Sequence, residues 1–192
     1  MKRLLKQNVL RGPARLVLKL MGWKLLDLNQ RPAKAVVIGY PHTSNWDFPV
    51  TLLALAALPF GAKWVGKDTM FRGILGLIMR GLGGIPVSRH ESTGFVARLV
   101  EEFRQREQFH LVIATEGTRR MQAGWKSGFY RIALAAKVPV IMAVVDYPKR
   151  EVGLLSSITL SGDEDTDMAQ IAACYDGRKG YHHEYASPIR LL

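Results

Sequence analysis

The chain has 192 residues, of which 48% are hydrophobic and 22% are charged, a composition that fits one folded domain and excludes a disordered chain. Lysine and arginine outnumber the acidic residues by 27 to 16, and the formal net charge of +11 favours an anionic partner such as nucleic acid, anionic lipid or a phosphorylated substrate. The longest apolar-rich stretch, 48–61, is too short to span a bilayer, and the single cysteine, Cys174, excludes an intrachain disulfide.

Residues 14–28 predict a basic amphipathic helix, because cationic and apolar side chains recur at helical spacing on separate stripes. The cationic stripe holds Arg11, Arg15 and Lys19, and the apolar stripe holds Leu16, Leu20 and Trp23. Two interpretations remain open: a helix that lies in a membrane interface, or an ordinary helix that packs on the domain. We divide the chain into a membrane-surface helix over 1–30 and a globular domain over 31–192.

From residue 35 onward, short apolar runs alternate with segments of helical length and periodicity. The predicted strands are 35–40, 63–65, 85–88, 110–114, 138–145 and 151–160. The predicted helices are 46–58, 70–82, 93–108 and 127–137, with a last one that follows an acidic cluster and covers 168–175. This alternation predicts a single α/β domain whose central sheet is mixed, mostly parallel and flanked by helices.

His42 and Asp47 follow the first strand of this series and are five positions apart. On one continuous helix they would point to different faces, so they meet only if a turn precedes a helix that begins near Asp47. The aspartate would then accept one imidazole N–H and leave the other nitrogen as a general base. The alternative is a capping box with Ser44 as the N-cap and Asp47 three residues on, which leaves His42 as a surface turn residue.

Two further segments carry groups suited to anion binding. After the strand over 110–114 the chain places a close-approach glycine, a hydroxyl and a guanidinium in succession, as Gly117, Thr118 and Arg119. The alternative for this segment is a charged turn. The segment 83–89 delivers Arg89 at the end of another predicted strand, where α/β folds gather ligand-binding groups.

The C-terminal segment is polar and rich in tyrosine and histidine. His182 and His183 are adjacent, so they lack the spacing of a zinc-binding pair on one helix face. We expect a solvated tail with no sharp functional signal.

Taken in order along the chain, these segments resemble the glycerolipid acyltransferases that include lysophosphatidic acid acyltransferase. The resemblance covers about residues 35–145. His42 and Asp47 match the family's catalytic motif, 84–89 its second block, 116–119 its third and 138–140 its fourth. The sequence departs from the family pattern at Pro41, Thr115 and Met142, positions that bear on which acceptor is used.

The resemblance implies that 31–192 is an acyltransferase domain in phospholipid biosynthesis that needs no cofactor and no metal. His42, oriented by Asp47, deprotonates the hydroxyl of an acceptor such as 1-acylglycerol-3-phosphate, which attacks the thioester of acyl-CoA or acyl carrier protein. The acceptor phosphate binds to Arg89 and to the block formed by Glu116, Gly117, Thr118 and Arg119. We expect the protein to be peripheral on the cytoplasmic face of an anionic membrane.

Two alternatives to this function are retained. The first is an acyltransferase with a non-glycerophosphate acceptor such as a lyso-aminolipid, which needs the same base and less of the arginine cradle. The second, from another class, is a basic nucleic-acid-binding protein, which would explain the charge of +11. The chain contains no recognised nucleic-acid-binding motif, so we expect no nucleic-acid partner.

Overall fold

The structure, a computed structural model, describes residues 2–59, 61–87 and 92–192. Within these residues seven strands form one sheet in the order β1-β7-β6-β2-β5-β3-β4. The strands are β1 (Lys24–Leu26), β2 (Lys34–Gly39), β3 (Ala62–Lys67), β4 (Gly84–Val87), β5 (Phe109–Ala114), β6 (Val140–Asp146) and β7 (Glu151–Ile158). Neighbouring strands are parallel, except that β6 and β7 are antiparallel. The predicted α/β domain with a mixed, mostly parallel sheet is confirmed.

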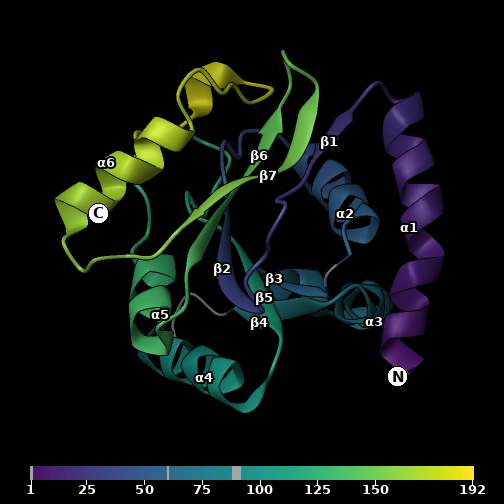
Figure 1. Ribbon diagram of the computed structural model, residues 1–192, viewed down its shortest axis with the longest axis horizontal. Coiled ribbons are helices and arrows are strands. Elements are labelled where there is room, and N and C mark those ends of the chain that lie inside the picture. The colour runs from purple at the N-terminus through teal and green to yellow at the C-terminus, as the bar shows by residue number, and fades with distance from the viewer. Residues whose placement is uncertain (1, 60, 88–91) are drawn as a thin grey trace.

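The α-helices of the described residues cover both faces of this sheet (Figure 1). One face carries α1 (Lys2–Leu20), α2 (Asp47–Ala57) and α3 (Gly73–Gly81). The other carries α4 (Ser92–Gln105), α5 (Gly128–Ala136) and α6 (Glu164–Cys174). Short 3-10 turns form η1 (Asp68–Phe71) and η2 (His183–Tyr185). A parallel sheet needs crossover connections on its faces, and these helices provide them.

The central strand β2 is buried on both faces. Val36 and Ile38 pack into the cluster that contains the apolar side chains of α4, α5 and α6. Ala35 and Val37 pack on the opposite face, beside Leu58 at the end of α2. Alternate side chains of a strand point to opposite faces, so a strand covered on both sides needs a continuous apolar run.

The helix predicted over 14–28 is wrong at both ends, because α1 covers Lys2–Leu20 and Lys24–Leu26 forms β1. Gly22 has a φ of 76°, a left-handed conformation that glycine adopts without steric cost and that ends the helix. The chain then turns into a three-residue strand that pairs with β7. The apolar residues of such a short strand fit a helical stripe equally well, so periodicity could not separate the two.

Helix α1 packs on the domain and also exposes apolar side chains. Ala14 and Leu18 are buried in a cluster with residues of α2, whereas Leu16 and Leu20 of the predicted apolar stripe are exposed. The buried face fits the interpretation of a helix that packs on the domain, and the membrane-interface interpretation stays a prediction for the exposed face. No helix of the described residues has the length and apolar content needed to cross a membrane.

Candidate active site

The two sequence segments with the clearest chemistry meet at one edge of the sheet. Gly39 at the end of β2 lies beside Ala114 at the end of β5 in the parallel register. The loop that carries His42 and the loop that carries Glu116 both start from this edge. Open α/β sheets bind ligands outside the carboxyl ends of their strands, so the location fits the prediction.

His42 and Asp47 form the pair that their spacing predicted. Nδ1 of His42 lies 3.1 Å from Oδ2 of Asp47, the first residue of α2. Asp47 is only 3% exposed, whereas the side chain of His42 is 23% exposed. Because an ionised carboxylate only accepts hydrogen bonds, Nδ1 is the donor in this contact, and in a neutral imidazole Nε2 is then the nitrogen that can accept a proton.

Asp47 also supports the backbone of the loop before α2. Its Oδ2 accepts the N–H groups of Thr43 at 2.8 Å and Ser44 at 2.9 Å. The Ser44 hydroxyl accepts the N–H of Trp46 at 3.1 Å, so only the aspartate half of the predicted capping box is formed. The capping and histidine-orienting roles of Asp47 are therefore compatible, because one oxygen performs both.

Tyr147 uses the second oxygen of the aspartate. The Tyr147 hydroxyl donates to Oδ1 of Asp47 at 3.0 Å, and burial together with the neighbouring Asp47 raises the pKa of Tyr147, which keeps the hydroxyl protonated. Sequence reasoning missed this residue, which lies 100 positions from Asp47 and belongs to no motif. Its one sequence signal was its place shortly after the predicted strand 138–145.

Glu116 is buried beneath the surface of the site, with 1% exposure. Its Oε2 accepts the backbone N–H of His42 at 2.6 Å, and its Oε1 accepts that of Ser187 at 2.8 Å. Burial raises the pKa of Glu116 although both hydrogen bonds oppose that shift. The Glu116 carboxylate thus connects the His42 loop to the C-terminal segment through two backbone hydrogen bonds.

Gly117 follows in the left-handed region at φ 66°, and a Cβ there would come within 2.9 Å of the Lys126 side chain. The position therefore favours glycine on conformational grounds, since the flexible end of the Lys126 side chain can move aside for a Cβ.

A cavity of about 760 Å3 opens beside the His42 loop; we call it the site cavity. It is lined by Thr43, Ser44, Asn45, Trp46, Thr118, Arg119, Arg120, Met121, Tyr181, His182 and Tyr185. Thr118 and Arg119 therefore lie where the sequence placed them, and Arg120 joins them, while Glu116 is outside the lining. Arg89 is outside the described residues.

The prediction of a solvated tail is wrong in part, because residues 181 and 183–185 are exposed but two residues that flank them are not. Gly180 and Ser187 are buried, and a side chain at Gly180 would clash with Thr43. His182 donates its backbone N–H to the Thr43 hydroxyl at 3.1 Å, while its side chain lines the site cavity. The hydrogen bond between His182 and Thr43 joins positions 139 apart in the chain, so local sequence patterns carried no sign of it.

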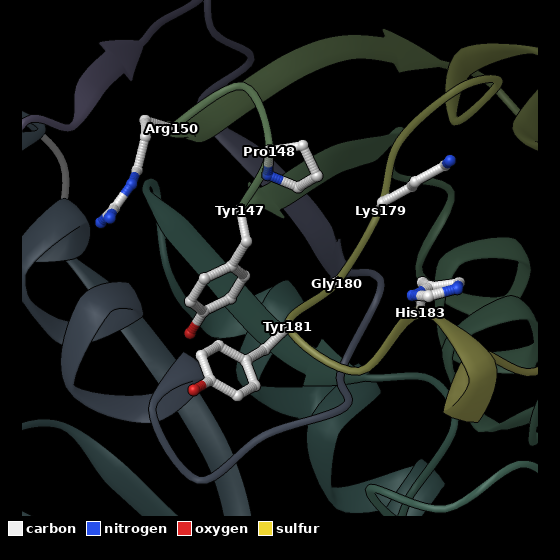
Figure 2. A pocket seen from close by; sticks show the side chains of 7 residues that line it. All are labelled: Tyr147, Pro148, Arg150, Lys179, Gly180, Tyr181 and His183. Carbon is white, nitrogen blue, oxygen red and sulfur yellow. The ribbon is translucent and has the colours of Figure 1, made fainter.

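A smaller cavity of about 360 Å3 lies on the other side of this segment, between it and the connection from β6 to β7 (Figure 2). Tyr147 and Tyr181 lie next to each other there with their rings in an edge-to-face arrangement, 5.1 Å between centroids. Across residues 2–59, 61–87 and 92–192, no group of three or more histidine, cysteine, aspartate or glutamate side chains could hold a metal ion.

Comparisons with known proteins agree with this geometry. A family model described as Acyltransferase matches residues 25–146. The fold is similar to the crystal structure of the 1-acyl-sn-glycerophosphate acyltransferase PlsC from Thermotoga maritima, with a TM-score of 0.61. That match has 12% sequence identity and covers 89% of this chain and 77% of the other, so it supports the fold alone. No curated protein sequence matches the chain at a significant level.

Proposed function

The chain belongs to the acyltransferase family, as its motifs predicted, and we propose that it moves a fatty acyl group from a thioester to the hydroxyl of a glycerolipid such as 1-acylglycerol-3-phosphate. The observation that carries the proposal is the 3.1 Å contact between His42 Nδ1 and Asp47 Oδ2, beside a cavity lined by Arg119. A base on a loop that borders a cavity lined by an arginine suits a phosphorylated acceptor alcohol.

In the proposed mechanism Asp47 holds the Nδ1 proton of His42, and Nε2 takes the proton of the acceptor hydroxyl. The hydroxyl oxygen attacks the carbonyl carbon of the thioester and forms a tetrahedral intermediate. Its collapse breaks the carbon–sulfur bond, and the departing thiolate takes the proton from the imidazolium. The products are an ester and a free thiol, and no acyl group is attached to the protein. Because a thiolate leaves readily, a base and correct orientation are the main requirements.

The acceptor phosphate is proposed to bind at Arg119, whose planar guanidinium can engage two oxygens at once. Thr118 lines the same cavity and offers a hydroxyl donor. Arg89 is proposed as a second phosphate ligand on sequence grounds. The buried Glu116 contributes indirectly, because its carboxylate holds the backbone of His42. The donor is acyl-CoA or acyl carrier protein, both of which are anionic and suit a chain with a charge of +11.

We also propose that the protein works as a peripheral protein on the cytoplasmic face of an anionic membrane, where its lipid substrates are found. The support comes from α1, which exposes Leu16 and Leu20 next to cationic side chains such as Lys19. Removing residues 1–30 would also remove strand β1 and the buried Trp23, so polar substitution of Leu16 and Leu20 is the cleaner test of this helix.

The proposed reaction is tested with the purified protein, an acyl thioester and a panel of acceptors, by following thiol release. We expect turnover with 1-acylglycerol-3-phosphate that exceeds hydrolysis without acceptor. A marked preference for a lyso-aminolipid would favour the alternative acceptor class. Thiol release that stays at the hydrolysis level with each acceptor and both donors would overturn the proposal.

A further inference from the structure

Helix α3 exposes an apolar face that no described part of the chain covers. Its large exposed side chains, together with the residue just beyond its end, are Ile74, Leu75, Leu77, Ile78 and Leu82. Ile74 is 80% exposed and Leu77 is 69% exposed. The buried residues of the helix, Gly76 and Met79, lie on its opposite side, as the helical period requires. A soluble monomer seldom exposes such a contiguous apolar patch unless it binds something.

The charges around α3 favour an anionic lipid surface as the partner. Asp68 lies at the start of η1, but residues 69–87 contain no aspartate or glutamate, and the exposed Arg72 and Arg80 lie at the two ends of the helix. Helix α1, on the same face of the sheet (Figure 1), also lacks acidic residues. An apolar face with cationic borders fits the boundary between the acyl chains and the anionic headgroups of a bilayer.

The position of α3 relates this face to the site. Strand β3 is parallel to β5, so η1 and the start of α3 follow from the same sheet edge as the Glu116 loop. Met79 of α3 belongs to a cluster against which Phe48 of α2 packs, and α2 begins with Asp47. A bilayer against α3 would therefore lie on the face of the sheet that carries α2.

We propose that α3 is a membrane-docking surface and inserts Ile74, Leu75, Leu77 and Ile78 into the surface of an anionic bilayer. The proposal deepens the peripheral association proposed above, and it assigns a main contact to a helix that the sequence presented as an ordinary connecting element. Binding to vesicles is measured without acyl transfer, so it can be judged even if the proposed reaction fails.

The test compares full-length Leu77→Asp with a matched control, Leu134→Asp, in a flotation assay with phosphatidylcholine vesicles containing anionic phosphatidylglycerol. Leu134 is also an exposed leucine, and it lies on α5 across the sheet. We expect vesicle binding to fall roughly tenfold or more for Leu77→Asp, since a buried leucine contributes about one such factor, and to stay unchanged for Leu134→Asp. Equal thermal unfolding of the two variants establishes that both are folded.

Unchanged vesicle binding by Leu77→Asp would overturn the proposal. The proposal would also be overturned if sedimentation showed that the wild-type protein is a dimer and Leu77→Asp a monomer, while both bind vesicles equally well. Helix α3 would then be covered by a second copy of the chain.

Tyr147 supports a second inference, from a different observation. Its ring lies between Trp23 and Tyr181, at centroid distances of 5.2 Å and 5.1 Å, both edge to face. Its backbone N–H donates to the Lys179 carbonyl at 3.1 Å. These three aromatic residues come from distant parts of the chain, and they all lie outside the matched range 25–146. They fix one hydroxyl against Oδ1 of Asp47.

We infer that Tyr147 is a positioning residue that holds the Asp47 carboxylate in the orientation in which Oδ2 meets His42. The inference rests on the proposed function. With Oδ1 held by the tyrosine hydroxyl and Oδ2 by the loop N–H groups, the carboxylate cannot turn without losing hydrogen bonds. Without the Tyr147 hydroxyl, Oδ1 of Asp47 loses a hydrogen bond. More of the negative charge of the carboxylate is then available to stabilise a protonated His42.

The test is Tyr147→Phe, which keeps the ring and removes only the hydroxyl. We expect kcat to fall roughly tenfold, the value of one hydrogen bond to a charged group, with little change in KM. The acidic limb of the pH–rate profile should move to higher pH. Three neighbouring ionisable groups are unchanged in this variant: Glu116, which binds the His42 backbone, and Arg150 and Tyr181, which lie near Tyr147.

Tyr130→Phe is the matched control, because Tyr130 donates to a different buried aspartate, Asp167, at 2.8 Å. It should lower the melting temperature and leave kcat and the pH profile unchanged. If Tyr147→Phe behaves in the same way, with a lower melting temperature and a normal kcat and pH profile, Tyr147 is structural and the inference is wrong. If the wild-type protein shows no acyl transfer, the proposed function is wrong. This outcome differs from the one that contradicts the role of Tyr147, in which the wild-type protein is active.

Discussion

Two buried aspartates of this protein are built almost alike. Asp47 is the first residue of α2, and Asp167 lies in the first turn of α6. Each accepts backbone N–H groups from the segment before its helix and a hydroxyl from a distant tyrosine; the donors are Thr43, Ser44 and Tyr147 for the first, and Ser161, Gly162 and Tyr130 for the second. Both carboxylates thus stabilise a helix start and join it to another part of the fold.

The difference between them is one histidine. Asp47 also binds the ring of His42, which is partly exposed beside the site cavity. Asp167 instead accepts the hydroxyl of Ser161. Burial opposes the ionisation of Asp167, but the hydrogen bonds from Ser161, Tyr130 and Gly162 outweigh it and lower its pKa. In the proposed mechanism, an aspartate that already supports its helix gains a second role, because a histidine lies against it at an open edge of the sheet.

The largest effect should come from removing that histidine. His42→Ala should reduce acyl transfer by about a hundred- to ten-thousandfold, the usual contribution of general-base catalysis. Thiol release at saturating acceptor measures the loss. His183→Ala is the control, since His183 is an exposed histidine of the C-terminal segment. If His42→Ala kept half the normal rate of acyl transfer or more, the histidine would not act as the base. Asp47 would then have no catalytic role that Asp167 lacks.

A smaller effect is expected at the anion-binding group of the site cavity. Arg119→Ala should raise the KM for a phosphorylated acceptor by roughly ten- to hundredfold, because it removes a charge-assisted hydrogen bond. Arg119→Lys should restore only part of the affinity, since an ammonium lacks the planar fork. Arg104→Ala, on the exposed surface of α4, controls for loss of positive charge. Equal acceptor KM values for the Arg119 and Arg104 variants would argue against phosphate binding at Arg119.

The smallest effect concerns stability and its dependence on pH. Because the folded pKa of Asp167 is below its ordinary value, its contribution is present above the unfolded pKa and is lost as the pH falls through the folded pKa. Asp167→Asn should therefore lower the free energy of unfolding at neutral pH by about 1 to 3 kcal/mol. The difference in the free energy of unfolding between wild type and Asp167→Asn should become smaller at acidic pH. Denaturant unfolding from neutral to acidic pH tests this, and a gap that widens in acid would contradict it.

Most of the sheet and the chemistry at its edge could be predicted from sequence, because the signals are local. Apolar runs such as 35–40 identify strands by themselves, and His42 and Asp47 are close enough in the chain for their spacing to require a turn before a helix. The block from Gly117 to Arg119 follows a strand directly, so its place at the sheet edge followed from the strand prediction. The family match over 25–146 covers this same part of the chain.

What could not be predicted depends on long-range contacts. Tyr147 reaches Asp47 across 100 positions, and Ser187 reaches Glu116 across 71. No periodicity or spacing records such pairs, so no local pattern indicated that the C-terminal segment lines the site cavity. Glu116 was placed among the phosphate-binding groups by its motif, whereas it is buried and accepts the backbone N–H groups of His42 and Ser187, both distant from it in the sequence.

The most direct test of the central claim measures Asp47→Asn and Asp167→Asn side by side, by acyl transfer and by denaturant unfolding. Asparagine keeps the size of each side chain and still accepts a hydrogen bond, but it no longer fixes the charge and tautomer of a neighbouring histidine. Asp47→Asn should be folded and slower by about a hundredfold or more, whereas Asp167→Asn should be less stable and transfer acyl groups at the normal rate. Near-normal transfer by a folded Asp47→Asn would show that Asp47, like Asp167, only supports its helix, and the proposed mechanism would be wrong.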